Sequence, residues 1–374
     1  MTSKGAGAGD RSLSYQAAGV LDNTQLGLNG LLGWVNRTKQ FRPAGRPGHP
    51  VLDIGFFASV VDLGNNLGLA LCTDGVGSKV LVAEMLQRYD TIGIDCVAMN
   101  VNDALCVGAE PISFLDYIAV ERATPRVLEE IARGLHRGAE LADVAIVGGE
   151  ISQMPDVLKG RAPGGGLDLS GMCAGIVSLD RIIVGRDVAP GNVIVGARSN
   201  GVHSNGLTLA RKVLFERGGL APDQHVPALG CAVGEELLRP THIYVRPVVE
   251  LLFKRAVPVR GLVHITGDGL LNLTRIAARV GFHLDNLPPS PPIFELIQTL
   301  GGVPAHEMYY VFNMGIGFCL IVEDDPSVVR AVSDTFAAHG FETSVIGKVV
   351  ADERKRVFLP KQNLVGEHDR FTDL

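Results

Sequence analysis

The amino-acid sequence predicts an α/β protein of two domains, with mixed sheets of the α+β kind. The chain has 374 residues, about twice the length of a typical domain. Strand-like and helix-like segments alternate along both halves, as expected of layered domains. A turn signal, Ala189-Pro190-Gly191-Asn192, separates the two series. We therefore expect an N-terminal domain over residues 1–188 and a C-terminal domain over residues 189–374.

In the first half, short β-branched runs bounded by glycine alternate with segments of helical periodicity. The leader 1–12, the Pro/Gly/Arg-rich stretch 41–50 and the glycine-rich stretch 160–166 are expected to be loops. The predicted strands are 51–63, 67–73, 111–120, 144–147 and 172–177, and the predicted helices are 26–38, 91–107 and 125–142.

The second half repeats this alternation of apolar runs and amphipathic segments, and the chain contains no short-period repeat. The predicted strands are 193–196, 261–266, 314–322 and 344–350, and the predicted helices are 207–217, 235–253, 270–280 and 326–339.

Composition excludes several classes of function. Lys and Arg total 34 against 40 Asp and Glu, a net charge of −6, which disfavours binding to nucleic acid or to an anionic membrane. The six cysteines form no C-x-x-C pair, so a disulfide scaffold or zinc site is not expected. The N-terminus lacks the apolar core of a signal peptide, and the longest apolar stretch, 308–322, is too short to span a bilayer. We expect a cytoplasmic protein.

A strand-end carboxylate is the first candidate for chemistry. The sequence has no P-loop, dinucleotide fingerprint, zincin or nucleophile-elbow motif. Asp74 ends the apolar strand 67–73 and is followed by Gly75, Gly77 and Lys79. This pattern suits a metal-bridged phosphate chain, with the carboxylate on Mg²⁺ and the amides and lysine on phosphate oxygens. An ordinary Asp-Gly turn is the alternative.

The predicted helix 91–107 carries four polar side chains among apolar ones, namely Asp95, Asn100, Asn102 and Asp103. Burying such groups without partners is costly. We therefore expect them to face a polar ligand, a metal or an interface. Capping and local hydrogen bonds are a sufficient alternative for Asp95, but a poor one for Asn102 and Asp103.

Two further carboxylates extend this pattern. Glu150 follows Gly148 and Gly149 after the predicted strand 144–147, and Asp53 lies within the strand-like run 51–63. Acidic residues that converge from strand ends would build a Mg-nucleotide site without a P-loop. The sequence therefore predicts that carboxylates of the first domain meet around magnesium.

In the second domain, two Ser-Asn-Gly triplets in Ser199–Gly206 precede a predicted helix. Exposed amides at such a position suit a phosphate group. His203, between the triplets, is a candidate for contact with substrate, although a lone histidine is more often structural. The segment 264–269, HITGDG, repeats the order of strand, glycine turn and helix.

These stretches resemble the phosphoribosylformylglycinamidine cyclo-ligase family, also called AIR synthetases. The resembling segments occur in family order and span most of the chain. They include TDGVGSK (73–79), NDALCVGAEP (102–111), VGGE (147–150), SNGVHSNG (199–206), HITGDG (264–269) and FNMGIG (312–317).

The resemblance implies an ATP-binding N-terminal domain and a C-terminal α/β sandwich, as in thiamine-monophosphate kinase and selenophosphate synthetase. It implies a homodimer in which strands of both subunits close a barrel. The implied reaction converts formylglycinamidine ribonucleotide and ATP to aminoimidazole ribonucleotide, ADP and phosphate, with Mg²⁺. ATP would phosphorylate the amide oxygen, and the amidine nitrogen would then close the ring.

The resemblance also implies roles for residues of both domains. The catalytic candidates are His203 and Asp103, and the metal candidates are Asp53, Asp74, Asp103 and Glu150. The ATP-binding candidates are Asp74, Gly75, Gly77, Lys79, Asn100, Asn102, Gly148 and Gly149. The substrate-binding candidates are Ser199, Asn200, Gly201, Ser204, Asn205, Thr266 and Asp268.

The chain departs from the family pattern at three places. IGFFASV (54–60) replaces a glycine-rich strand, GGEISQMP (148–155) lacks a usual Thr and Glu, and Asp268 replaces a glycine. The alternatives are a related ATP-dependent phosphoryl transfer on another substrate, or an ATP-binding paralogue that has lost catalysis.

Overall fold

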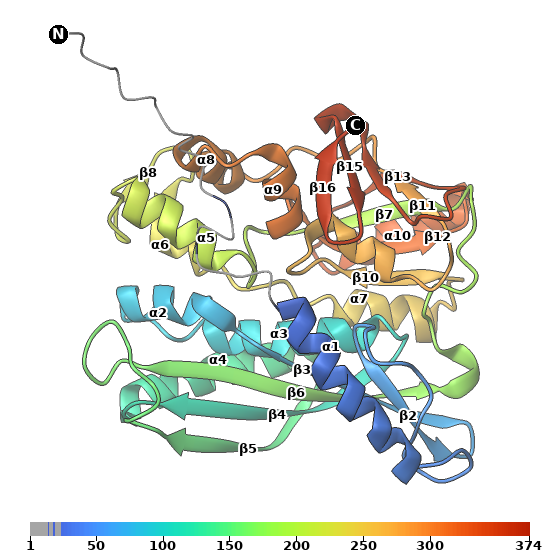
Figure 1. Cartoon of the computed structure of the whole chain (residues 1–374), viewed down its shortest axis with the longest axis horizontal. Coiled ribbons are helices and arrows are strands. Elements are labelled where there is room, and N and C mark those ends of the chain that lie inside the picture. Colours follow the sequence, from blue (N-terminus) through green and yellow to red (C-terminus); the bar gives the residue numbers. More distant parts are fainter. Residues whose placement is uncertain (1–13, 15–17, 19–23) are drawn as a thin grey trace, which may run out of the picture.

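The computed structural model of the chain describes Ser14, Ala18 and residues 24–374, and the predicted leader 1–12 lies outside these residues. Figure 1 shows the N-terminal half, in blue to green, lying along one side of the C-terminal half, in yellow to red. Each half has its own sheet, and helices lie between the N-terminal sheet and the C-terminal half. Mixed sheets with helices confirm the predicted fold class. No helix within the described residues is long and apolar enough to cross a membrane.

The N-terminal half contains a six-stranded sheet in the order β1-β2-β3-β6-β4-β5. Neighbouring strands are antiparallel except β4 and β5, which are parallel and joined by a helical crossover. The strands are β1 His49–Pro50, β2 Ser59–Gly64, β3 Leu67–Gly75, β4 Glu110–Val120, β5 Ala145–Gln153 and β6 Leu167–Ser178.

Two long helices cover one face of this sheet. These two helices, α3 and α4, pack closely because Gly93 has no side chain. A Cβ at Gly93 would lie only 2.3 Å from the backbone nitrogen of Leu135. The helices are α1 Thr24–Val35, α2 Val80–Leu86, α3 Ile92–Leu105 and α4 Pro125–Ala142, with 3₁₀ turns at Asn36–Phe41, Gly77–Lys79 and Leu179–Arg181.

The C-terminal half contains an eight-stranded sheet in the order β10-β12-β7-β13-β11-β14-β15-β16 and a small β8-β9 hairpin. The strands are β7 Val193–Arg198, β8 His225–Val226, β9 Cys231–Ala232, β10 Gly261–His264, β11 Gly281–His283, β12 Ile316–Val322, β13 Thr343–Val350, β14 Val357–Leu359, β15 Leu364–Glu367 and β16 Arg370–Asp373. The helices are α5 Leu207–Arg211, α6 Val233–Leu237, α7 Val245–Val249, α8 Pro292–Gly301, α9 Ala305–Val311 and α10 Pro326–Ala338. Shorter helical turns cover Lys212–Arg217, Glu250–Lys254, Gly269–Arg275 and Pro360–Gln362.

Several predicted elements were wrong in extent; the predicted strands 144–147 and 172–177, for example, are longer in the structure, Ala145–Gln153 and Leu167–Ser178. The predicted strand 51–63 is regular only from Ser59, because the preceding residues form turns. The predicted helix 235–253 is interrupted around Pro240, where proline cannot continue a helix. The predicted helix 270–280 is a 3₁₀ helix that ends at Arg275. The helices α2, α8 and α9 and the strands β11, β14, β15 and β16 were not predicted.

Helix α3 joins the two halves through buried polar side chains. One Asp95 oxygen, Oδ1, accepts hydrogen bonds from Lys79 Nζ at 2.9 Å, from Thr241 N and Oγ1 at 2.7 Å each, and from Ser204 Oγ at 3.1 Å. Asn102 donates to the carbonyl of His242 and accepts from the amide of Tyr244. A buried polar group is tolerated when it is hydrogen-bonded, so these contacts fix the C-terminal half against α3.

We predict that Asp95→Asn lowers the free energy of unfolding by about 3–5 kcal/mol, because it leaves the fully buried Lys79 ammonium without its counter-charge. Lys79→Met should cost less, because Asp95 keeps its donors from Thr241 and Ser204. Denaturant unfolding measures both, and Arg133→Ala, at an exposed ion pair of α4, is the control. Equal stability of Asp95→Asn and the wild type would contradict the prediction.

Candidate active site between the two halves

Asp74 lies at the end of β3, where the chain turns into the 3₁₀ helix Gly77–Lys79. Its Oδ1 accepts the amide of Gly75 at 2.7 Å, and Gly77 adopts a positive φ of 65°, which glycine allows without strain. Burial raises the pKa of Asp74, and the negative charge of Asp103 raises it further. Two predicted metal ligands therefore lie close enough to interact electrostatically.

Asp103, near the C-terminal end of α3, faces the other half of the molecule. Its Oδ1 is 2.8 Å from Nδ1 of His264, the last residue of β10. The His264 side chain is buried, whereas the Asp103 side chain is 16% exposed. Asp103 therefore keeps access to a ligand while His264 fixes its orientation.

The segment after His264 brings further polar groups to these carboxylates. Arg275 is 2.8 Å from Asp268 Oδ2, its guanidinium lies 5.0 Å from the ring centre of Phe57, and its charge acts on Asp74. Thr266 is held by its amide, which donates to Asn272 at 2.7 Å. The structure thus brings the predicted Thr266 and Asp268 to the site, together with Arg275 and Asn272, which were not predicted.

The predicted substrate loop Ser199–Gly206 is braced by Asn313, which was not predicted as a site residue. Asn313 Oδ1 accepts from Ser199 Oγ at 2.7 Å, and its Nδ2 donates to the carbonyl of Gly201 at 2.9 Å. Asn200 donates to the carbonyl of Pro240 at 2.9 Å. These side chains therefore hold the loop rigid.

The same loop approaches both the β3 turn and the segment after β10. Asn205 Oδ1 would lie 3.5 Å from a Cβ at Gly267. Thr208 Oγ1, just past the loop, is 2.9 Å from Ser78 Oγ. Loops from both halves of the chain therefore converge around Asp74 and Asp103.

His203 is buried within this loop at a positive φ of 61°. Neither ring nitrogen has a hydrogen-bond partner among the described residues, and the ring stacks on His242 with centroids 5.8 Å apart. Burial, followed by the charges of His242, Lys79 and His264, holds the pKa of His203 well below its usual value. The imidazole is therefore neutral at physiological pH.

Three predicted ATP-binding side chains are instead used in protein packing. Lys79 is fully buried between Asp95 and the carbonyl of Arg239. Asn100 donates to the carbonyls of Asp74 and Cys96, and Asn102 bridges α3 to the C-terminal half. Because none of the three is exposed, we assign them to the support of the site rather than to contact with nucleotide.

The four predicted metal carboxylates do not assemble within one chain, and the described residues contain no group of three metal-binding side chains. Asp53 is fully exposed and paired with Lys39. Glu150 lies on the edge strand β5, three strands from Gly75, which corresponds to roughly 14 Å. The structure therefore separates Asp53 and Glu150 from the pair formed by Asp74 and Asp103.

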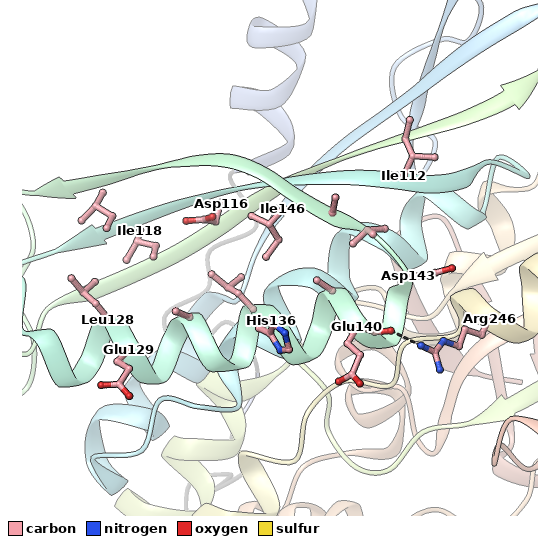
Figure 2. A pocket seen from close by; sticks show the side chains of 16 residues that line it. Ile112, Asp116, Ile118, Leu128, Glu129, His136, Glu140, Asp143, Ile146 and Arg246 are labelled. Carbon is pink, nitrogen blue, oxygen red and sulfur yellow. Dashed lines mark hydrogen bonds between the residues drawn. The ribbon is translucent and has the colours of Figure 1, made fainter.

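The predicted Gly148 and Gly149 also lie on β5. A Cβ at Gly149 would be 2.6 Å from Oδ1 of Asp116, so packing against Asp116 accounts for this glycine. Asp116 lies in a groove of about 1160 Å³ between α4 and the strands β4 and β5 (Figure 2). None of the predicted site residues lines this groove.

Asp74 and Asp103 suit a divalent cation. Mg²⁺ keeps several waters and binds proteins through one or two carboxylates plus the phosphates of a substrate. Burial and, after it, repulsion by Asp103 raise the Asp74 pKa, and a bound cation would offset both effects. The pair therefore fits a metal that arrives with a nucleotide.

Comparisons with protein families match both halves of the chain. The family described as AIR synthase related protein, N-terminal domain, matches residues 57–177, and the family described as AIR synthase related protein, C-terminal domain, matches residues 189–360.

Similar proteins cover most of the chain. The phosphoribosylformylglycinamidine cyclo-ligase of Methanothermobacter thermautotrophicus is 45% identical over 338 residues, which cover 90% of this chain and 94% of the relative. The protein of the same name from Pyrococcus furiosus is 48% identical over 314 residues, covering 84% of this chain and 89% of the relative.

Solved structures share the fold at low identity. Thiamine-monophosphate kinase from Stenotrophomonas maltophilia K279a superposes with a TM-score of 0.58 at 22% identity, covering 86% of this chain and 93% of that one. AaThiL complexed with AMPPCP and TMP superposes with a TM-score of 0.61 at 16% identity, and the match covers 94% of this chain and 99% of that one. At this identity the likeness concerns the fold alone.

The partly buried His242 predicts a pH dependence of stability. Burial lowers its pKa from 6.5 to about 4. Between these values the unfolded chain binds a proton that the native protein does not. Stability contributed by the neutral ring is therefore present above pH 6.5 and lost as pH falls, by up to about 1.4 kcal/mol per pH unit.

We expect His242→Phe, which keeps an aromatic ring beside Phe341, to flatten the decline in unfolding free energy between pH 6.5 and 4. Denaturant titrations across that range measure the slope. His306→Phe, at an exposed position of α9, should keep the wild-type slope. Identical slopes for His242→Phe and the wild type would show that His242 is not the group responsible.

Proposed function

This chain belongs to the AIR synthase related family, and on that premise we propose that it is a phosphoribosylformylglycinamidine cyclo-ligase. The observation that carries the proposal is 43–48% identity to proteins of that name over 79–92% of the chain. The reaction uses ATP to close the imidazole ring of formylglycinamidine ribonucleotide, giving aminoimidazole ribonucleotide, ADP and phosphate. This is a step of purine biosynthesis.

The chemistry divides into activation and ring closure. The amide oxygen of the substrate takes the terminal phosphoryl group of ATP, which turns a poor leaving group into phosphate. The amidine nitrogen then attacks the activated carbon, and phosphate departs. A protein that catalyses these steps mainly positions the reactants and stabilises charge.

Asp74 and Asp103 would hold Mg²⁺ in this reaction. When bound, the metal neutralises charge on the ATP phosphates. His264 keeps the Asp103 carboxylate oriented toward the space between the two halves. Arg275, held by Asp268 at 2.8 Å, adds a positive charge near the same carboxylates.

We assign the Ser199–Gly206 loop and Thr266 to the ribonucleotide substrate. The bracing of this loop by Asn313 supports the assignment, because a rigid loop fixes the reacting groups at low entropic cost. His203 remains the catalytic candidate of the loop. As a neutral imidazole it would exchange one proton or stabilise developing charge, rather than act as a fixed cation.

We further propose the domain limits 1–188 for ATP and metal and 189–374 for substrate. The cytoplasm is the proposed location, and the free state of all six described cysteines is consistent with a reducing compartment.

The test is incubation of the full chain with formylglycinamidine ribonucleotide, ATP and Mg²⁺. We expect one aminoimidazole ribonucleotide and one phosphate per ATP consumed. ATP turnover with another acceptor and no aminoimidazole product would favour a related phosphoryl-transfer enzyme. An absence of turnover with any acceptor would indicate a paralogue that has lost catalysis.

In that assay, Asp103→Asn should lower kcat at least about 100-fold, because a contact that stabilises transition-state charge is worth about 3 kcal/mol or more. The amide can still accept a hydrogen bond from His264, so the thermal midpoint should change little. Asp334→Asn, at an exposed position of α10, is the matched control. Near-normal turnover by Asp103→Asn would remove this carboxylate from the site.

We propose that the enzyme is a homodimer joined through the N-terminal sheet. β5 is an edge strand, and it exposes 64% of Val147 and 52% of Ile151, while the neighbouring Tyr117 on β4 is 38% exposed. Exposed apolar edge strands are usually covered. Pairing with the sheet of a second copy would cover them.

Ile151→Glu should shift the protein from dimer to monomer in analytical ultracentrifugation, because a charge would have to be buried in the interface. Phe253→Glu, at an exposed apolar residue of the C-terminal half, should leave the mass unchanged. A dimer that is unaffected by Ile151→Glu would place the interface elsewhere.

A further inference from the structure

Arg211, the last residue of α5, is a buried cation that forms no ion pair with any described residue. Arg211 is only 9% exposed, and its Nε is sealed from solvent with no hydrogen-bond partner among the described residues. The charge of Glu216 acts on Arg211 from beyond ion-pairing distance. Burying a guanidinium in this way is costly unless an anion accompanies it.

A second arginine, Arg161, acts electrostatically on the Arg211 guanidinium. Burial lowers the pKa of Arg211, the charge of Glu216 offsets this in part, and the positive charge of Arg161 lowers the pKa further. Arg161 lies in the glycine-rich stretch 160–166 and is exposed. The charges of Arg211 and Arg161 leave a local positive charge that Glu216 offsets only in part, on a chain whose net charge is −6.

A contact of Thr208 places helix α5, which ends at Arg211, beside the turn that follows Asp74. Thr208 Oγ1 is 2.9 Å from Ser78 Oγ in that turn. Residues three apart in a helix lie on the same face, so Arg211 continues the face of α5 that Thr208 presents to Ser78.

The glycine-rich stretch reaches the same end of the N-terminal sheet. The amide of Ala162 donates to Glu84 Oε1 of α2 at 2.9 Å. The stretch leads directly into β6, where Ser170 pairs with Gly75. Arg161 therefore lies at the end of the sheet from which the Asp74 turn emerges.

We propose that Arg211, assisted by Arg161, binds the 5′-phosphate of the ribonucleotide substrate. The guanidinium group matches a phosphate because its planar fork donates two parallel hydrogen bonds. The inference rests on the proposed function for the identity of the ligand, but the anion site itself rests on Arg211 and its surroundings.

The substrate monoester fits this position better than the phosphates of ATP. A Mg-bound polyphosphate needs carboxylates that hold the metal, and these are Asp74 and Asp103. The surroundings of Arg211 instead supply two positive charges and one acidic neighbour, Glu216, which is not ion-paired with it. Such a site takes a phosphate without a metal.

The experiment compares Arg211→Met with the wild-type full chain. Calorimetric titration with ribose 5-phosphate, and with ribose as the unphosphorylated control, measures the phosphate site without any turnover. Steady-state assays then give KM separately for formylglycinamidine ribonucleotide and for ATP. Arg330→Met, an identical change at an exposed residue of α10, is the matched control.

We expect Arg211→Met to weaken binding of ribose 5-phosphate at least tenfold and to raise KM for the ribonucleotide at least tenfold. KM for ATP should stay within twofold, and Arg330→Met should match the wild type. Should Arg211→Met not fold, Arg211→Lys, which keeps the charge but not the fork, should show a smaller loss in the same direction.

Unchanged binding and unchanged KM in the folded variants would overturn the phosphate site. An increase in KM for ATP alone would overturn the assignment to the substrate and give the site to the nucleotide. Wild-type binding of ribose 5-phosphate that depends on Arg211, without ring closure, would refute the proposed function and keep the site. Ring closure with the same KM for the ribonucleotide in Arg211→Met and the wild type would support the proposed function and refute the phosphate site at Arg211.

Discussion

The single oxygen Oδ1 of Asp95 holds the two halves of the molecule in register. It accepts hydrogen bonds from the ammonium of Lys79, the amide and hydroxyl of Thr241 and the hydroxyl of Ser204, whereas Oδ2 is buried with no partner among the described residues. Every donor but Lys79 comes from the C-terminal half. Because Ser204 belongs to the proposed substrate loop, this buried contact fixes that loop relative to the β3 turn that carries Asp74. The geometry of the site therefore depends on an interaction that takes no part in its chemistry.

Helix α3 performs two tasks along its length. Asp95, Asn100 and Asn102 are buried and use their polar atoms within the protein. Asp103, in its last turn, keeps part of its carboxylate exposed. Polar residues on a buried helix are tolerated where they are hydrogen-bonded, so one helix can supply both the interface and the metal-type carboxylate. Rigid support from a helix also positions a ligand more accurately than a loop would.

The sequence predicted the fold class and most long elements from local periodicity, and Asp74 and Asp103 from polar residues at the ends of a strand and within a helix. The placing of Thr266 and Asp268 came from the family resemblance. It could not separate ligand-binding from supporting polar residues. The amide of Asn102 and the ammonium of Lys79 could equally bind a ligand or support the protein. Only their tertiary contacts, with His242 and with Asp95, show that both support the protein. Arg211 was not singled out because a lone arginine in a helix has no local signal, and its isolation becomes visible only when its burial is known.

The charges around the proposed cleft differ along its length. Asp74 and Asp103 form a negative end that requires a cation before it can receive phosphates. Arg211 and Arg161 form a positive end that attracts a phosphate directly. A ribonucleotide whose phosphate lay at the positive end would have one orientation available, because the opposite orientation would bring its phosphate against the carboxylates. Electrostatic complementarity of this kind fixes register more than it adds affinity, and a reaction that joins two ends of one small molecule depends on register above all.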